Sequence, residues 1–344
     1  MTPWYPSEKD AMSGLFVQKH VEAVRAQGCD VRVIFAQTLW DTWRQYKTLC
    51  REGWRPDIVQ LNVIQKQGLF ALWLKKHYGI PYLIVEHWSG YLPENGMFMR
   101  MSAPKKKMYR LIAKEASMLL TVSEPLTKAM QACDIENARW EHIDNVVDDF
   151  FYKSIINHQS SIINHQKTLL HVSCFDEHAK NVKGLLRAAK MLSEKRKDWK
   201  LVLVGTGVDY EDVRAYAENL EIPDGVLEWT GELTPREVAN EMHNADALVL
   251  SSRYETYGVV LAEAVAAGLP ILSTPVGIAE QVADIIVPQE IAQHKPGRFA
   301  EFIETILWNE KITHHPSPIT NQFTANAIGR KLTAVYDSCL HHDI

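Results

Sequence analysis

The chain alternates between short apolar runs and amphipathic stretches along most of its length. The apolar runs are rich in β-branched residues or continuously apolar, which is typical of strands buried on both faces of a parallel sheet. Between them, apolar residues recur with helical spacing, as in "GLFVQKHVEAVRAQG" and "GLFALWLKKHYG". This alternation predicts an α/β fold with helices flanking parallel sheets. We expect strands at residues 30–36, 57–63, 81–87 and 117–123, and again at 168–173, 200–205, 226–231, 246–252 and 269–275.

The alternation stops between residues 151 and 167, where "SIINHQS" is followed at once by "SIINHQK". Solenoid repeats have longer periods and at least three copies, so we interpret residues 151–167 as a linker between domains. The recurrence of His158 and His165 leaves a metal site as an alternative interpretation.

The length also favours two domains, because 344 residues exceed what one hydrophobic core usually spans. The domains are then residues 1–150 and 168–320, each built on a parallel sheet. The last helix, at about 324–340 within a segment 321–344, has apolar residues along one side and is expected to pack on either domain, including back on the N-terminal one.

Composition narrows the class of protein. With 46% hydrophobic and 23% charged residues the chain reads as soluble and globular, and a net charge of -5 argues against nucleic acid as the main partner. The five cysteines are scattered without a C-x-x-C spacing, which indicates a reducing compartment rather than a disulfide framework or a zinc site. No apolar run is long enough for a membrane span, and the first residues lack the apolar core of a signal peptide, so we expect a cytoplasmic location.

The stretch "SSRYETYGVVLAEAVAAGLP" carries two glutamates, Glu255 and Glu263, in a run that otherwise looks like core. Burying a carboxylate without a partner costs several kcal/mol, so each should either face solvent or hold something. Glu255 follows an expected strand and precedes an expected helix, at the carboxyl edge of the sheet where ligands of α/β folds bind. The free N–H groups of a helix N-terminus there suit a diphosphate. The alternative is a solvated Glu255 and a Glu263 paired with a nearby Lys or Arg.

The same stretch resembles a known family. "ETYGVVLAE" is similar to the E-x7-E signature of the retaining, nucleotide-sugar-dependent glycosyltransferases of family 4. "VEHWSGY", "LLTVSE", "SCFDEHAKNVKGLLRA", "LVLVGTG" and "WTGEL" match the family in the same order over most of the chain, excluding the linker. The resemblance implies the GT-B architecture: two Rossmann-like domains facing a cleft, the N-terminal one binding the acceptor and the C-terminal one the nucleotide sugar.

The resemblance also implies roles for single residues. His87 would reach the reacting sugar, Lys180 would clamp the donor diphosphate and Glu255 would contact the transferred sugar, while Glu263 would bind the ribose. A structural histidine and a solvated helix-start lysine are the alternatives for His87 and Lys180. The other substrate-binding positions that it implies are Gly14, Gly205, Gly207, Thr230, Gly231, Glu232, Leu233, Thr256, Tyr257 and Gly258.

The activity implied is retaining transfer of a sugar, from a UDP-sugar more than a GDP-sugar, to a glycan or lipid-linked acceptor in cell-surface polysaccharide synthesis. No cofactor is implied. The chain has no D-x-D triplet to hold a metal against a diphosphate, so we expect a metal-independent reaction in which Lys180 and helix N-termini meet the phosphate charge. The run "KKKMYRLIAK" at residues 105–114 is either a weak peripheral contact with the inner face of a membrane or a solvated helix face. The acceptor and the oligomeric state are not encoded in any pattern.

The chain departs from the family at three places. Cys174 stands where an arginine is usual, six residues before Lys180. Gly277 stands alone where relatives often have two glycines. The sequence begins after the point where the first strand of relatives ends, which predicts an N-terminal sheet without its central strand. Other functions with the same features are a nucleotide-sugar 2-epimerase and a sugar-nucleotide-binding protein without turnover. An NAD-dependent dehydrogenase is disfavoured because "GTG" lacks the third glycine of G-x-G-x-x-G.

Overall fold

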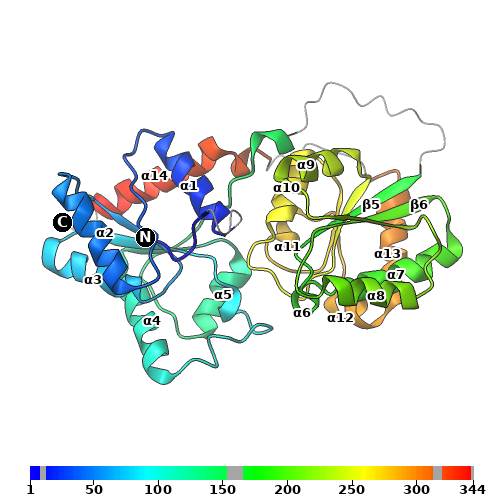
Figure 1. The fold of residues 1–344 in the computed structure, drawn as a ribbon, viewed down its shortest axis with the longest axis horizontal. Helices are drawn as coiled ribbons and strands as arrows, with labels where there is room; N and C mark the ends of the chain where they lie inside the picture. The colour runs from blue at the N-terminus through cyan, green and yellow to red at the C-terminus, as the bar shows by residue number, and fades with distance from the viewer. Residues whose placement is uncertain (8–12, 153–165, 313–319, 342–344) are drawn as a thin grey trace. The chain divides into compact units, whose positions relative to one another are not determined.

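The computed structural model describes residues 1–7, 13–152, 166–312 and 320–341. It divides the chain into two compact units, which we call the N-terminal unit (Met1–Val146 with Asn321–Ile344) and the C-terminal unit (Val147–Thr320) (Figure 1). Most of the linker expected at 151–167, with His158 and His165, lies outside the described residues.

The N-terminal unit is built on a parallel sheet of four strands in the order β1-β2-β3-β4. The strands are β1 (Val59–Asn62), β2 (Tyr82–Glu86), β3 (Met118–Thr121) and β4 (Trp140–His142). The helices of this unit are α1 (Leu15–Arg25), α2 (Leu39–Arg51), α3 (Gln67–Tyr78), α4 (Ala103–Glu115), α5 (Glu124–Ala132) and α14 (Ala325–His341), with 3-10 turns η1 (Ser89–Tyr91) and, just before α14, η3 (Thr320–Phe323).

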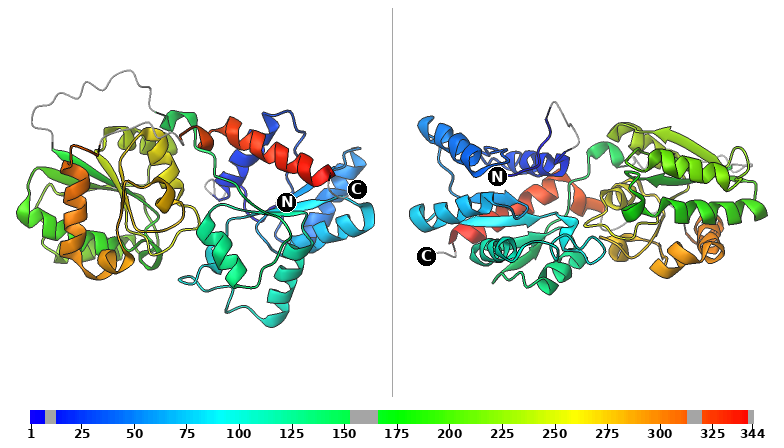
Figure 2. Two further views of the ribbon diagram at one scale, coloured as in Figure 1. Left: turned by 180° about the vertical axis from the view of Figure 1, so that it is seen from behind. Right: turned by 60° about the horizontal axis from the view of Figure 1, so that its bottom comes forward.

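Helices cover both faces of this sheet, as the views in Figure 2 show. Alternate residues of β2 serve the two faces: Leu83 and Val85 join a buried cluster with α1 and α14, while the hydroxyl of Tyr82 donates to the Ile112 carbonyl of α4 at 2.7 Å. The last helix therefore packs on the N-terminal unit, where Leu332 is fully buried.

One expected strand does not form. Residues 30–36 make only an isolated parallel bridge, between Phe35 and Thr2. Thr2 exchanges hydrogen bonds with the backbone at residues 34 and 36, and Met1 does so with residues 60 and 62 of β1, but two residues cannot extend a ladder. These two residues also line a cavity of about 300 Å³, together with Val31, Val59 and Tyr336 among others. The run is apolar enough for a strand, but it has no neighbour of sufficient length to pair with.

The C-terminal unit contains a parallel sheet of six strands in the order β10-β9-β8-β5-β6-β7. They are β5 (Lys167–Val172), β6 (Trp199–Val204), β7 (Leu227–Gly231), β8 (Ala247–Leu250), β9 (Ile271–Ser273) and β10 (Ile285–Ile286). The chain moves outward from β5 to β7 and then returns to place β8 on the other side of β5. The point where the strand order reverses therefore lies between β5 and β8, and ligands of open α/β sheets bind at such a point.

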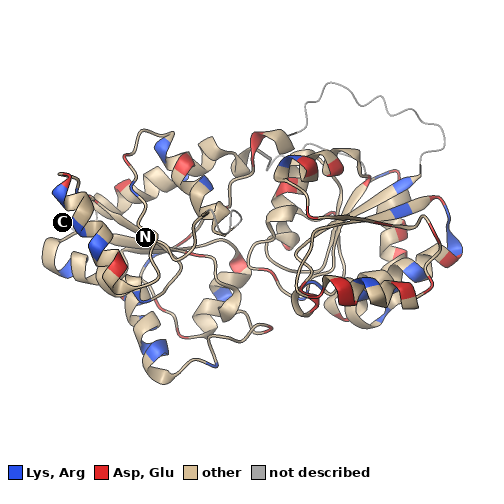
Figure 3. Ribbon diagram, in the orientation of Figure 1, with Lys and Arg blue, Asp and Glu red and all other residues tan. Residues whose placement is uncertain are grey.

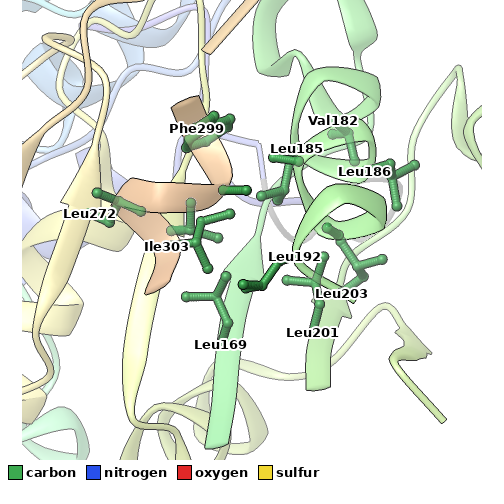
Figure 4. Packing of buried hydrophobic residues seen from close by; sticks show 14 of the residues in the cluster. Leu169, Val182, Leu185, Leu186, Leu192, Leu201, Leu203, Leu272, Phe299 and Ile303 are labelled. Carbon is green, nitrogen blue, oxygen red and sulfur yellow. The ribbon is translucent and has the colours of Figure 1, made fainter. Parts of the chain in front are cut away.

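Helices also cover both faces of the larger sheet. Its helices are α6 (Glu177–Lys180), α7 (Val182–Lys195), α8 (Tyr210–Asn219), α9 (Pro235–Asn244), α10 (Val259–Ala267), α11 (Ala279–Val282), α12 (Gln289–His294) and α13 (Pro296–Trp308), with a 3-10 turn η2 (Asp149–Phe151) at the start of the unit. Figure 4 shows Leu185 and Leu192 of α7 in the same buried cluster as Leu169 of β5 and Ile303 of α13. This continuous buried cluster fixes the central strands β5 and β6, and with them the loops at their carboxyl ends.

Apart from residues 30–36, each expected strand forms, which confirms the α/β prediction. The short edge strands β4 and β10 were not predicted. Figure 3 shows Lys and Arg interspersed with Asp and Glu along the ribbon of each unit. None of the helices in the described part of the chain combines the length and the hydropathy that crossing a bilayer requires.

Candidate functional site

Two of the predicted residues meet at the reversal point of the larger sheet. Lys180 is the last residue of α6, which follows β5, and Glu255 lies in the loop between β8 and α10. The Lys180 Nζ is 2.5 Å from the Glu255 Oε1, and the two side chains are only 15% and 14% exposed. The Ser252 hydroxyl donates to the same carboxylate oxygen at 2.8 Å. Glu255 is therefore not a solvated loop residue, because it holds the lysine.

The charge on Lys180 is maintained by its neighbours. Burial lowers the pKa of the Lys180 ammonium, but the carboxylate of Glu255, the nearby Cys174 thiol and Asp176 act against it, and the net pKa is raised. The side chain is therefore a partly buried cation at neutral pH, with one anionic partner that it could exchange for a phosphate oxygen.

The short helix α6 is fixed by contacts that the sequence did not suggest. Asn181 follows Lys180 in a left-handed conformation (φ 52°), and its buried amide donates to the carbonyls of Ser251 (3.3 Å) and Ala292 (3.2 Å). The Arg253 guanidinium donates to Asn181 Oδ1 at 2.9 Å, and its backbone N–H donates to the Ala179 carbonyl at 2.7 Å. The loop after β8 thus holds α6 through hydrogen bonds from both the backbone and the side chain of Arg253. These bonds also fix the backbone of Lys180. The only feature of the sequence that could have drawn attention to Arg253 is its charge, two positions before Glu255.

The turn that leads into α10 is equally constrained. Gly258 caps the helix with φ 79°, a conformation that favours glycine. A Cβ on Gly277 would lie 2.1 Å from the Tyr257 carbonyl oxygen, which instead accepts the Ile278 N–H at 3.0 Å. Thr256 and Tyr257 are therefore held at the start of α10, beside the first-turn N–H groups, which in any α-helix have no carbonyl four residues earlier in the helix to bond.

Glu263 lies in the second turn of α10, where it is partly exposed although Leu261, Ala262 and Ala264 are buried. It is the polar position of an otherwise apolar helix. Glu263 lies on α10, whereas Glu255 lies in the loop just before this helix.

The remaining predicted residues of this unit lie at the ends of β6 and β7. A Cβ on Gly205 would come 1.9 Å from the Ser173 carbonyl oxygen, and one on Gly207 would come 2.5 Å from the Phe175 nitrogen. The chain's own backbone therefore already requires glycine at both positions. The Gly205 N–H donates to the Gly231 carbonyl at 2.7 Å, so the turn after β6 contacts the segment of Thr230, Gly231, Glu232 and Leu233.

The other two predicted residues, Gly14 and His87, belong to the N-terminal unit. Gly14 caps α1 at φ 67°, and a Cβ there would come 2.4 Å from the Trp4 backbone, so packing alone accounts for the glycine. His87 follows β2 and is 8% exposed. Its Nε2 is buried without a hydrogen-bond partner among the described residues.

The surroundings of His87 keep its imidazole neutral. The ring of Phe16 covers it with centroids 4.2 Å apart, and the ring of His20 lies 5.9 Å away. Burial lowers the pKa of His87 well below its usual value, and burial lowers that of His20 to about 4. A substrate can reach Nε2 of His87 only if the residues that cover it move.

In the described ranges, no group of three or more His, Cys, Asp or Glu side chains is placed to hold a metal ion. Cys174 is an exposed free thiol.

Two family models match the chain in succession. One described as "Glycosyl transferases group 1" matches residues 153–323, and one described as "Glycosyltransferase Family 4" matches residues 13–149. The chain belongs to the family 4, group 1 glycosyltransferases. The resemblance carried by "ETYGVVLAE" and the other motifs is thereby confirmed.

Curated relatives of this family match over shorter segments. The chain is 33% identical over 129 residues to the lipopolysaccharide 1,6-galactosyltransferase of Escherichia coli K12, a match that covers 37% of this chain and 34% of the relative. It is 38% identical over 108 residues to the alpha-monoglucosyldiacylglycerol synthase of Streptococcus pneumoniae, covering 31% of this chain and 24% of the relative. The matched segments thus span about a third or less of these relatives' length.

Solved structures extend the similarity to both units. A structure of Anabaena Alr3699/HepE in complex with UDP and glucose superimposes with a TM-score of 0.69 at 16% identity, covering 92% of this chain and 89% of the other. The apo form of the lipopolysaccharide outer core galactosyltransferase WaaB gives a TM-score of 0.61 at 20% identity, covering 89% and 83%. These likenesses confirm the GT-B fold.

Proposed function

We propose that this protein transfers a sugar from a nucleotide-sugar donor to a glycan or lipid-linked acceptor, with retention of the anomeric configuration. The observation that carries the proposal is the Lys180–Glu255 pair at the strand-order reversal of the larger sheet, beside the N-terminus of α10. A cation and free helix N–H groups together suit a diphosphate, and the carboxylate suits sugar hydroxyls.

Each residue then has a role in the transfer. The donor diphosphate displaces Glu255 from Lys180, and Lys180 with the α10 N-terminus stabilises the charge on the departing nucleotide. The released Glu255 contacts the transferred sugar, and Glu263 binds the ribose hydroxyls. His87 contributes the unpaired Nε2 to the reacting sugar after the ring of Phe16 moves aside. The acceptor hydroxyl attacks the sugar from the face that the leaving phosphate vacates and gives its proton to that phosphate. The new glycosidic bond thus replaces the sugar–phosphate bond on the same face, which retains the configuration.

Other predicted positions supply backbone rather than charge. Thr256, Tyr257 and Gly258 bring the first N–H groups of α10 to the donor, and Gly205, Gly207 and residues 230–233 flank its nucleoside. Gly14 caps the start of α1 in the N-terminal unit, as Gly258 caps α10, and is likewise proposed to bring backbone close to the donor.

The comparisons favour a UDP-sugar and a surface glycan or lipid as partners. A neighbour of the same fold is described in complex with UDP and glucose, and two relatives are named for lipopolysaccharide and diacylglycerol products. We propose cell-surface polysaccharide synthesis at the inner face of the membrane. The basic run of α4, which extends from Lys105 to Lys114, is the proposed weak contact with that membrane.

A thermal-shift screen with UDP-, GDP-, ADP- and dTDP-sugars tests the donor. A UDP-sugar at about 100 times its Kd should stabilise the folded protein by about 2.7 kcal/mol. The donor that binds is then tested for hydrolysis with and without EDTA, and NMR of the released sugar gives the anomer formed first. Equal rates with EDTA are expected, and inversion would exclude the front-face mechanism. Interconversion of a donor with its 2-epimer would favour the epimerase, while binding without turnover on a broad acceptor panel would favour a non-catalytic binding protein.

A further inference from the structure

A buried carboxylate lies at the active edge of the N-terminal sheet and is not used in the mechanism above. Glu86 is the last residue of β2 and is 0% exposed. Its Oε2 accepts the Ile64 N–H at 2.9 Å, and its Oε1 accepts the N–H groups of His87 (3.0 Å) and Trp88 (2.9 Å). One carboxylate therefore ties the segment after β1 to the turn after β2.

The segment that it holds is strained. Val63, immediately before Ile64, has φ 62°, a left-handed conformation that a β-branched residue rarely adopts. Its N–H donates to the Val85 carbonyl at 2.9 Å, and the next N–H donates to Glu86. Such strain persists only where the surroundings enforce it. The two hydrogen bonds, one to β2 and one to its terminal carboxylate, supply that enforcement.

Apolar packing does not account for Glu86. Burial raises the pKa of this carboxyl to about 7, although the N–H groups of Trp88, Ile64 and His87 each act to lower it. Buried charges usually cost more than a well-packed apolar residue of similar volume, so burial by itself does not favour a glutamate here. A leucine would release three N–H groups at the ends of two neighbouring strands. The carboxylate is therefore explained by the geometry that it imposes.

That geometry directly concerns His87. Two of the three N–H groups belong to His87 and the residue after it, so the carboxylate fixes the backbone from which the imidazole projects. The imidazole in turn presents a buried Nε2 with no hydrogen-bond partner among the described residues. Buried polar atoms without a partner are uncommon and require an explanation, of which a role with a ligand is one.

We propose that Glu86 is a positioning residue: its carboxylate joins the β1 and β2 loop ends and so holds the His87 imidazole in the orientation that serves the transferred sugar. This inference rests on the proposed function of His87. Glu86 itself does not touch the substrate; it acts through the turn that it fixes.

A double-mutant cycle in the full-length protein tests the coupling. Glu86→Gln keeps the size of the side chain but turns an N–H donor toward one of the three N–H groups. With the donor sugar that gives the highest turnover in the screen above, this change should lower kcat by about 10- to 100-fold, the range typical of lost positioning contacts. The donor KM should stay within about twofold, because the donor is assigned to the C-terminal unit.

The decisive variant is Glu86→Gln combined with His87→Ala. If Glu86 acts through His87, the double variant should be no slower than His87→Ala alone. Multiplicative losses would overturn the proposal, since they would show that Glu86 contributes independently of the imidazole. Glu86→Asp, which keeps the charge on a shorter stem, should recover part of the activity. Glu124→Gln, which removes a carboxylate of an exposed ion pair in the same unit, is the matched control and should leave kcat unchanged.

Hydrogen exchange separates this proposal from the function on which it rests. In Glu86→Gln, exchange should accelerate at the amides of Ile64, His87 and Trp88 but not at Leu126, whose N–H donates to the Ser123 hydroxyl. Unchanged exchange at the first three amides would overturn the clamp whatever the activity. A wild-type protein that turns over no donor would refute the proposed function, and a His87→Ala variant with full turnover would refute the role of His87. In either case the exchange rates would still test whether Glu86 holds the two loop ends.

Discussion

The carboxyl edges of the two sheets both carry a glutamate, but in opposite settings. In the C-terminal unit Glu255 is partly exposed and pairs with the Lys180 ammonium at 2.5 Å. In the N-terminal unit Glu86 is fully buried and is held by three backbone N–H groups. The first carboxylate can exchange its partner for a ligand, whereas the second cannot leave without exposing the backbone it satisfies.

The difference extends to the neighbouring groups. The edge of the C-terminal unit presents a cation whose net pKa is raised, beside a helix N-terminus. The edge of the N-terminal unit presents imidazoles that burial keeps neutral. The charge at the first edge would suit a phosphate, and the second edge holds an uncharged imidazole. Mutations at the two edges should therefore change different properties of the protein.

The largest effect is expected at the exchangeable pair. Lys180→Ala removes the cation that we propose stabilises the leaving phosphate, so kcat should fall by about 10²- to 10³-fold. Steady-state donor hydrolysis measures it. Lys183→Ala, which removes a lysine paired with the largely exposed Asp212, is the control and should be near wild type. An unchanged rate for Lys180→Ala would remove the distinction between the two edges.

Glu255→Gln should separate binding from turnover. The amide no longer competes with the donor phosphates for Lys180, so the donor Kd from titration should stay equal or become smaller. The turnover should nevertheless fall by about 10- to 100-fold, because an interaction made only in the transition state lowers kcat. The free protein should also melt at a lower temperature, since the ammonium loses its partner. Glu228→Gln, at an exposed pair with Lys200, is the matched control. A weaker Kd with unchanged kcat would contradict this assignment.

Acid should destabilise the protein through its buried imidazoles. Burial lowers the pKa of His171 from 6.5 to about 4, and its ring nitrogens are bonded to the Val249 carbonyl and the Ser173 hydroxyl. Its stabilising contribution is full above pH 6.5 and is lost as the pH falls toward 4. At pH 5 the loss is about 2 kcal/mol. His20, in the N-terminal unit, should behave in the same way.

Glu86 works in the opposite direction. Its pKa is raised from 4.5 to about 7, so its contribution is full below pH 4.5 and is lost as the pH rises through 7. Urea midpoints at pH 7.5 and pH 5 measure the sum, and we expect a lower midpoint at pH 5. Glu86→Gln should enlarge that decrease. A midpoint that is unchanged or higher at pH 5 would show that the imidazoles are not held neutral.

The smallest effects are expected at glycines. Gly225 has φ 80°, and no atom lies within 4 Å of the place that a Cβ would take, so Gly225→Ala should cost only the left-handed conformation, about 1 kcal/mol. Gly277→Ala adds a clash with the Tyr257 carbonyl and should lower the melting temperature further. It should also weaken donor binding, because the turn before α10 must move. Equal melting temperatures for the two variants would show that this turn is not constrained.

The sequence predicted most of the sheets because buried parallel strands are continuously apolar, as at residues 82–85 and 118–121. It failed at residues 30–36, where the pattern suits a strand but only Thr2 is available to pair with it. Strand formation depends on a neighbour, which a local pattern does not show. The two-residue β10 is too short to produce a pattern at all.

The candidate site was predicted only in part for a similar reason. Lys180 and Glu255 were both identified through motifs, but their ion pair spans 75 positions of sequence and depends on the strand order. Glu86 was overlooked beside His87, because the partners of its carboxylate are backbone N–H groups that no side-chain pattern reveals. Arg253 and Asn181 were missed because their effect is to fix α6 rather than to contact a ligand.

The packing of α14 has a consequence for biosynthesis. The core of the N-terminal unit includes Ile328, Leu332 and Val335, which are translated after the entire C-terminal unit. Domains generally fold during synthesis in the order in which they emerge from the ribosome. Here the first unit to emerge cannot close its core until the last helix is released, so the second unit should reach its native state first. A released chain that is truncated after residue 320 should therefore contain a protease-resistant C-terminal unit and a protease-sensitive N-terminal one.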